Sequence, residues 1–121
     1  YETRILNVHT LKPIDADAVV RAACETGVVL TAEEHQIGAL AWRVSGILTE
    51  SPELYDLPLI TGAIGVKDRF GDSGAPWELI KEFEVSAEHI AHKGAQLLAF
   101  KKKRAEEKRE EREHLFYAGM R

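Results

Sequence analysis

Two adjacent carboxylates and an imidazole form the densest group of potentially reactive side chains in this sequence: Glu33, Glu34 and His35. Neighbouring residues of a strand point to opposite sides, so the two glutamates cannot share a proton. The chemistry open to the group is an acid/base couple between one glutamate and His35. The structural alternative, which we favour, is that one glutamate caps the following helix and the other meets solvent or a partner subunit.

A short strand and a helix are expected on either side of this group. Residues 28–31 form an apolar run rich in β-branched side chains, which predicts a strand buried on both faces. A helix is expected over 37–49, with Gly38 and Gly46 inside it. Glycine destabilises a helix by about 1 kcal/mol relative to alanine, so both suggest close packing against a neighbour. The group is therefore expected on a strand-to-helix turn, where ligands and partners dock in α/β sheets.

Two more strands and three more helices complete the expected domain. The strands are predicted at 4–9 and 57–65. One helix begins near Pro76 and another is capped by Ser86. The first helix is capped by Asp15, ends at Gly27 as its C′ residue, and carries an apolar stripe of Ala16, Val19, Val20, Ala23 and Cys24. Because Cys24 lies on that stripe, we expect a small core residue rather than a reactive thiol.

The order of these elements predicts an α/β domain with three layers, in which helices flank a small, mostly parallel (mixed) sheet. This domain is expected to cover 1–100, and 101–121 is expected to be a tail forming a long charged helix. Opposite charges four residues apart support that helix, as in Lys102/Glu106, Lys103/Glu107 and Arg109/Glu113. The tail has no apolar heptad, which disfavours a coiled coil. Its apolar end at 115–117 could dock on a partner or on the chain's own body.

Composition excludes several function classes. The chain has 121 residues, of which 45% are apolar, enough for one core. A net charge of −4 gives no reason to expect nucleic acid, and the basic run 101–104 is followed at once by acidic residues. The single cysteine excludes an internal disulfide and favours a cytoplasmic location. No apolar run is long enough to span a membrane. Because the sequence lacks an initiator methionine, we expect it to begin inside a longer polypeptide.

A second segment resembles a catalytic motif but is not interpreted as one. Residues 71–74, Gly-Asp-Ser-Gly, are similar to the nucleophile segment of trypsin-like proteases, but the expected helices contradict that fold. We expect Asp72 or Ser73 to cap the helix near Pro76 instead. The remaining histidines stand at no convincing metal-ligand spacing: His9, His89, His92 and His114. We therefore predict no catalytic, cofactor-binding or metal-binding residue in this chain.

Four blocks of sequence, in order and spacing, resemble the C-terminal domain of transketolases. They lie at 5–15, 25–27, 31–38 and 68–74, within a resemblance that covers about 4–98. The wider family includes 1-deoxyxylulose-5-phosphate synthase and the beta subunits of 2-oxo acid dehydrogenases, and the histidine after the two glutamates is most similar to transketolase. The sequence departs from the family at Ala39 and Ala41, where glycines are usual.

The resemblance implies a domain without the main catalytic groups, in an enzyme that moves two-carbon ketol units between sugar phosphates. It implies thiamine diphosphate and magnesium held by two preceding domains across a dimer interface, and this domain would lack its usual first strand and helix. The expected partners are other domains or subunits of a homodimer, with no nucleic acid and no membrane. Candidate interface or ligand contacts are Glu33, Glu34, His35, Arg69, Asp72 and Ser73.

Two other interpretations remain open at this point. The chain could be a stand-alone protein-interaction module that keeps the fold and uses 33–35 and the charged tail to bind a protein. It could also be the C-terminal domain of a 2-oxo acid dehydrogenase beta subunit, which would help to dock an acyltransferase core. Sequence upstream of this chain would separate them, since only the enzymes need a thiamine-binding domain there.

Overall fold

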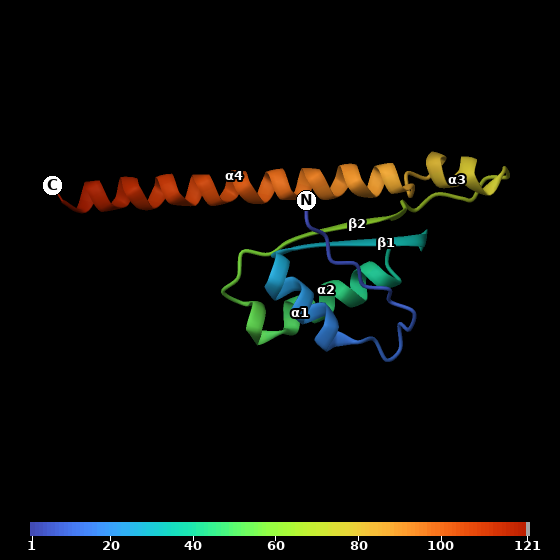
Figure 1. Cartoon of the computed structure of the whole chain (residues 1–121), viewed down its shortest axis with the longest axis horizontal. Helices are drawn as coiled ribbons and strands as arrows, with labels where there is room; N and C mark the ends of the chain where they lie inside the picture. Colours follow the sequence, from blue (N-terminus) through green and yellow to red (C-terminus); the bar gives the residue numbers. More distant parts are fainter. Residues whose placement is uncertain (121) are drawn as a thin grey trace.

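A computed structural model describes residues 1–120 and contains a parallel two-stranded sheet between helices (Figure 1). Val28 of β1 lies opposite Ile60 of β2. The elements in chain order are α1 (Ala16–Thr26), β1 (Val28–Gln36), α2 (Leu40–Glu50), the 3-10 turn η1 (Pro52–Leu54), β2 (Ile60–Val66), α3 (Pro76–Glu82) and α4 (Ala87–Gly119).

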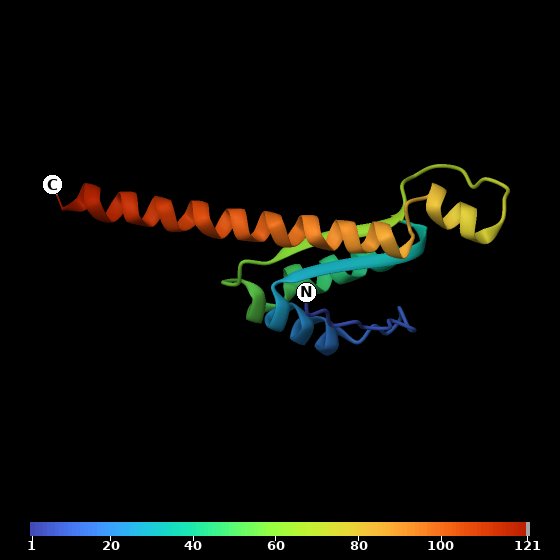
Figure 2. The ribbon, with the colours of Figure 1, turned by 45° about the horizontal axis from the view of Figure 1, so that its top comes forward.

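The helices form layers on both faces of this sheet. Helices α1 and α2 lie on one face and α4 lies along the other, as the two views agree (Figures 1 and 2). The predicted three-layer α/β architecture, with a small parallel sheet and a long C-terminal helix, is confirmed. The sheet is not mixed, because its two strands are parallel.

The predicted first strand at 4–9 is wrong, because residues 1–15 form neither helix nor strand. Side chains rather than a backbone ladder hold this segment. The Arg4 guanidinium forms an ion pair with Glu25, and the ring of Tyr1 lies 5.9 Å from the Lys102 ammonium. Ile5, which a buried strand would cover, is 85% exposed.

Local capping signals were predicted correctly in the first helix. The Asp15 carboxylate accepts a hydrogen bond of 3.0 Å from the Ala18 N–H. Gly27 ends α1 in the left-handed region at φ 62°, and its N–H donates to the Ala23 carbonyl at 2.8 Å. A left-handed C′ residue is most easily supplied by glycine, since it has no Cβ.

The core joins α1 to α2 and η1. Its buried members are Val19, Ala23, Val44, Leu48 and Leu54. The buried face of α1 is centred on Val19 and Ala23, so Ala16 and Cys24 fall at its edge and are exposed. The prediction that Cys24 is a core residue is therefore wrong.

Strand β1 continues through the carboxylate group instead of ending before it. From Ala32 to Gln36 strand β1 advances by four residues, whereas the paired stretch of β2 advances by only two, from Ile64 to Val66. The difference is a bulge, which changes the direction of side chains. Residues 33–35 therefore lie in a bulged strand, and the expected strand-to-helix turn is wrong.

The bulge closes onto Gly65 of β2. A Cβ at Gly65 would lie 2.8 Å from Ile37 Cγ1, 3.0 Å from the His35 carbonyl oxygen and 3.2 Å from Glu33 Cγ. The distances to Ile37 Cγ1 and to the His35 carbonyl oxygen are shorter than normal packing allows. The carbonyl oxygen of His35 cannot move without moving the bulge. Gly65 is therefore a spatial requirement of this site.

The two glycines expected inside the second helix behave differently. Helix α2 begins at Leu40, and Gly38 lies before it at φ 136°. Gly46 is in the helix, but a Cβ there would meet nothing within 4 Å. The expected close packing is therefore wrong at Gly46.

A single helix, α4, contains both an apolar stripe and the charged run. Ser86 caps it, as predicted, by accepting from the His89 N–H. Leu97 is buried against the sheet, where Gly62 leaves room for it. The charged half extends beyond the body of the domain (Figures 1 and 2). The predicted tail at 101–121 is helical as far as Gly119, and residue 121 lies outside the described residues. No helix within residues 1–120 is both long and apolar enough to cross a membrane.

Opposite outcomes are expected when each of two glycines is replaced by alanine. Gly65→Ala should lower the free energy of unfolding by about 1–3 kcal/mol, because the methyl group overpacks the bulge. Gly46→Ala should raise it by about 0.5–1 kcal/mol through helix propensity alone. Urea unfolding measures both, and equal effects of the two substitutions would contradict the role of Gly65.

Candidate functional site

The carboxyl ends of β1 and β2 and the loop 67–75 form a polar edge that contains all the predicted contact residues. Glu33 lies at its centre. The Oε1 atom of Glu33 accepts from the Gly38 and Ala41 N–H groups at 3.2 Å each, and Oε2 accepts from the Leu40 N–H at 2.8 Å. The residue at the N-cap of α2, Ala39, makes no side-chain cap. Glu33 therefore caps α2 from the neighbouring strand, where a negative charge also complements the helix dipole.

Glu34 and His35 are exposed and do not join Glu33 in a reactive group. His35 Nδ1 lies 3.1 Å from the Gln36 carbonyl oxygen. Among residues 1–120, no hydrogen bond connects His35 to either glutamate. The acid/base couple allowed by the sequence is not formed here, and the helix-capping alternative describes Glu33.

Arg69 connects the loop to both strand and helix. Its carbonyl oxygen accepts from Gln36 Nε2 at 2.8 Å, which ties the loop to the end of β1. Its guanidinium lies 2.7 Å from the Glu82 carboxylate and 4.5 Å from the centre of the Phe83 ring. Asp72 is a more distant partner at 4.0 Å. These contacts neutralise Arg69 and hold the loop against α3.

Asp72 and Ser73 do not cap the third helix. The N-cap of α3 is Ala75, which makes no side-chain cap, while Pro76 opens the helix as predicted. Both Asp72 and Ser73 are exposed on the loop. Their neighbour Phe70 is 97% exposed, so this loop presents an aromatic ring to solvent.

An ion pair links the end of β2 to the end of α3. Lys67 Nζ lies 2.5 Å from the Glu84 carboxylate, and this hydrogen bond lowers the pKa of Glu84. Glu84 occupies the left-handed region at φ 57°, where Val85 N–H donates back to the Ile80 carbonyl and closes the helix end. Both cations of the polar edge, Lys67 and Arg69, are thus paired with glutamates.

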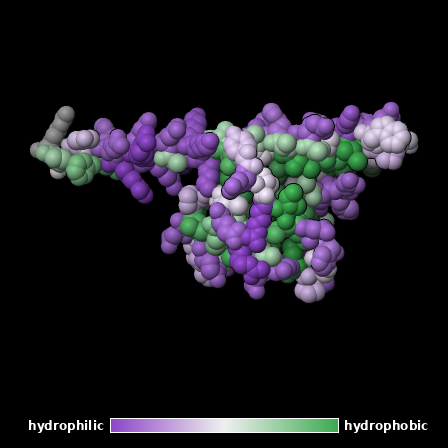
Figure 3. Space-filling model, viewed as in Figure 1, coloured by the Kyte–Doolittle hydropathy of each residue, from purple (hydrophilic) through white to green (hydrophobic). Residues whose placement is uncertain are grey.

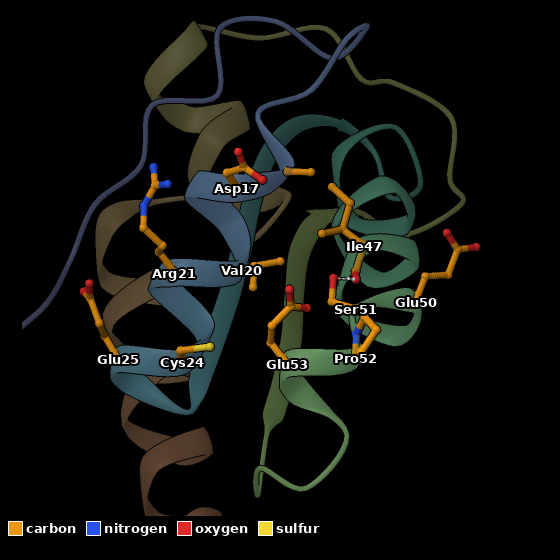
Figure 4. A pocket seen from close by; sticks show the side chains of 11 residues that line it. Asp17, Val20, Arg21, Cys24, Glu25, Ile47, Glu50, Ser51, Pro52 and Glu53 are labelled. Atoms are coloured by element: carbon orange, nitrogen blue, oxygen red, sulfur yellow. Dashed lines mark hydrogen bonds between the residues drawn. The ribbon is translucent and has the colours of Figure 1, made fainter.

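An open groove of about 630 Å³ lies between α1 and the α2–η1 segment (Figure 4). Cys24 and Val20 border it from α1, and Ile47 borders it from α2. The sulfur of Cys24 faces this groove rather than the core. The groove shares no lining residue with the polar edge, so it is a separate surface.

A smaller cavity of about 250 Å³ lies between the sheet and α2. Thr31 lines it, and its buried hydroxyl has no hydrogen-bond partner in the described part of the chain. Trp42, also in the lining, is 72% exposed. We did not predict this partly covered sheet face from the sequence. The available signal was Trp42, an aromatic residue that does not share a helix face with Val44 and Leu48.

The described residues contain no set of metal ligands. Within 1–120, no three histidine, cysteine, aspartate or glutamate side chains come close enough to hold an ion. Two other histidines bond within α4: His89 Nδ1 lies 2.8 Å from the Ser86 hydroxyl, and His92 lies 2.9 Å from Gln96.

Comparisons with known proteins find a matching family and several relatives. A family model described as "Transketolase, C-terminal domain" matches residues 1–90. The 6-deoxy-6-sulfo-D-fructose transketolase subunit SqwH of Clostridium sp. (strain MSTE9) is 39% identical over 71% of this chain and 26% of its own length. An apulose-4-phosphate transketolase subunit of Phocaeicola vulgatus is 32% identical over 74% of this chain and 27% of its own length.

More distant relatives include a 1-deoxy-D-xylulose-5-phosphate synthase of Symbiobacterium thermophilum, which is 28% identical over 78% of this chain and 14% of its own length. The chain thus spans about a quarter, or less, of the curated relatives that it matches. No solved structure matches the chain significantly.

Neutralising each of the two adjacent glutamates should separate their roles. Glu33→Gln should lower the free energy of unfolding by about 1–2 kcal/mol, because it removes the charge that caps α2. Glu34→Gln is the matched control and should change it by less than about 0.5 kcal/mol, since Glu34 is exposed. Urea unfolding at neutral pH measures both values, and equal losses would show that Glu33 does not anchor α2.

The ion pair of Lys67 and Glu84 should contribute a pH-dependent part of the stability. Because the folded pKa of Glu84 is lowered, this contribution is present above the unfolded pKa of about 4.3 and is lost as the pH falls through the folded pKa. Lys67→Met should therefore destabilise the chain at pH 6 more than at pH 3. Arg43→Met, at an exposed position on α2, is the control. An NMR titration of Glu84 that is unchanged in Lys67→Met would contradict the pairing.

Proposed function

Because the chain belongs to the family of transketolase C-terminal domains, we propose that it is the C-terminal part of a transketolase-like enzyme in which it packs subunits together. The enzyme would use thiamine diphosphate and magnesium to transfer two-carbon ketol units between sugar phosphates, as a transferase of the pentose phosphate pathway. The family match over residues 1–90 is the observation that carries this proposal.

The chemistry of the polar edge supports a packing role for this domain. A diphosphate with a divalent metal needs free cations or carboxylates. Here Lys67 and Arg69 are each paired with a glutamate, and both oxygens of Glu33 accept backbone hydrogen bonds. The described residues do not fit the cofactor, so other domains of the enzyme would hold it.

The exposed surface supports partners of protein character. Phe70 and Trp42 are large and apolar but largely exposed, and a partner surface would cover them. Apolar residues also gather beside the sheet in the space-filling view (Figure 3). Two of the relatives are named as transketolase subunits. We propose that Glu34, His35 and Ser73, which are exposed on the polar edge, contact another domain or subunit of a cytoplasmic homodimer.

The test is the intact mass of the source protein, together with a ketol-transfer assay in the presence of thiamine diphosphate and magnesium. We expect a mass several times 13.5 kDa and ketol transfer. A mass near 13.5 kDa without thiamine binding would overturn the proposal and favour a stand-alone interaction module. Acyl-group transfer from a 2-oxo acid would instead favour a dehydrogenase beta subunit.

The same enzyme allows a test of the contact role. His35→Ala should weaken subunit assembly, measured by sedimentation, while the free energy of unfolding of the 121-residue chain changes by less than about 0.5 kcal/mol. His9→Ala, exposed on the N-terminal segment, is the matched control. Unchanged assembly in His35→Ala would remove this residue from the interface.

A further inference from the structure

We propose that the projecting half of α4, residues 102–119, docks into the groove between α1 and the α2–η1 segment of a second copy of this chain. The second copy returns the same contact, so two helices fill two grooves. This pairing uses neither the polar edge nor a cofactor, and it is therefore independent of the proposed enzyme function.

The groove combines an apolar floor with an acidic rim. Val20 and Ile47, both partly buried, border it from the two helices. Its charged lining residues are four carboxylates and one guanidinium: Asp17, Glu25, Glu50, Glu53 and Arg21. Among residues 1–120, only Glu25 of these carboxylates forms an ion pair, with Arg4. Glu53 rises from η1 into the space between the helices (Figure 4). The groove therefore suits an occupant that is both apolar and positively charged.

One face of the projecting helix has this character. At about 100° per residue, a face about 120° wide, here called the docking face, contains three cations and three apolar residues: Arg104, Lys108, Arg112, Ala105, Leu115 and Phe116. The glutamates of this half of α4 all lie outside the docking face: Glu106, Glu107, Glu110, Glu111 and Glu113. Within residues 1–120, Lys108 and Arg112 form no ion pair, while Arg104 lies 3.0 Å from Glu107.

The docking face looks toward the side of α4 on which the chain's own body lies. Nearer the beginning of the helix, Leu97 on this side is buried against the sheet, and the Lys101 ammonium donates to the Thr26 carbonyl oxygen at 2.9 Å. Beyond Lys101 the helix leaves the body in both views (Figures 1 and 2). Leu115 is 70% exposed and Phe116 is 65% exposed. A continuous helix carries this apolar end away from the body, which rules out docking on the chain's own core.

The order of the layers allows both copies to make this contact at once. Helix α4 lies on one face of the sheet, and α1 and α2 lie on the other (Figures 1 and 2). A two-fold axis perpendicular to α4 turns the α1–α2 layer of each copy toward the projecting helix of the other. The two bodies then lie side by side, and the two α4 helices lie on the outer sides of the pair. From Lys102 to Arg112 the helix rises about 15 Å, which leaves room for the near wall of the second copy's groove.

Charge and apolar surface are complementary in this arrangement. Phe116 covers the apolar floor of the groove, and Lys108 and Arg112 face its acidic rim. The glutamates of α4 point to solvent on the far side of the helix. Because a helix is only about 10 Å thick, they would repel a phosphate backbone at the docking face, and nucleic acid is not the occupant. Exposed ion pairs are individually weak and screened by salt, so the dimer is reversible and salt-sensitive.

Crosslinking tests the contact through Cys24, the only cysteine of the chain, whose sulfur faces the groove (Figure 4). Gly119→Cys places a second thiol on the side of the docking face, where a Cβ would meet nothing within 4 Å. A short bismaleimide should join this thiol to Cys24 of the second copy and give a covalent dimer of twice 13.5 kDa in denaturing electrophoresis.

Tyr117→Cys, on the opposite side of the helix, is the matched control and should crosslink several-fold less. The wild-type chain should give no covalent dimer, because the two Cys24 thiols lie in separate grooves. A crosslinked product that keeps the mass of one chain would show docking within that chain and would overturn the proposal. Equal yields of dimer from Gly119→Cys and Tyr117→Cys would overturn it as well.

Charge reversal in the 121-residue chain, followed by sedimentation equilibrium, tests the ionic part of the contact. Arg112→Glu sets a glutamate against the acidic rim, and Glu53→Arg sets an arginine against the docking face. Each variant alone should therefore dimerise about tenfold more weakly. In an equimolar mixture, a heterodimer pairs opposite charges at both of its contacts. The mixture should dimerise about as strongly as the wild-type chain.

Controls separate docking from loss of helix and from the polar edge. Lys103→Glu reverses a charge on the side of α4 away from the docking face and should leave dimerisation within about twofold. His35→Ala, on the polar edge, should leave it unchanged, and circular dichroism should show equal helix content in all the variants. A wild-type chain that stays monomeric at every concentration would overturn the proposal. So would a mixture that does not restore the dimer, or a Lys103→Glu variant that dimerises as weakly as Arg112→Glu.

Discussion

The carboxylate of Glu33 at the beginning of α2 is the contact on which the arrangement of this domain depends. Glu33, which belongs to β1, accepts the capping hydrogen bonds that the side chain of Ala39 cannot make. The bulge that places Glu33 at the helix requires glycine at position 65 of the adjacent strand, because a Cβ there would collide with the bulge. One carboxylate thus fixes the direction of α2, and with it the packing of Val44 and Leu48 against α1.

Capping explains which parts of the fold could be predicted from the sequence. Asp15, Gly27 and Ser86 act on backbone groups within a few residues, so their types and spacing were sufficient. The failures depend on distant partners. The strand at 4–9 needed a neighbouring ladder that this segment does not join, and no pattern within β1 predicted a bulge that Gly65 permits. The exposure of Cys24 likewise depends on how far α1 is rotated against the sheet.

The candidate site shows why reactive residue types alone are poor guides to chemistry. Glu33, Arg69 and Lys67 could all serve a reaction, but each is occupied by a structural contact with backbone or with an opposite charge. A charge that holds a helix or a loop is already stabilised in the resting fold, and a reaction would have to break that contact first. Within residues 1–120, Glu34 and Ser73 make no side-chain hydrogen bond or ion pair, and the His35 ring contacts only the Gln36 carbonyl oxygen. These exposed groups suit recognition of another surface. The packing role that we propose for this domain rests on these exposed groups.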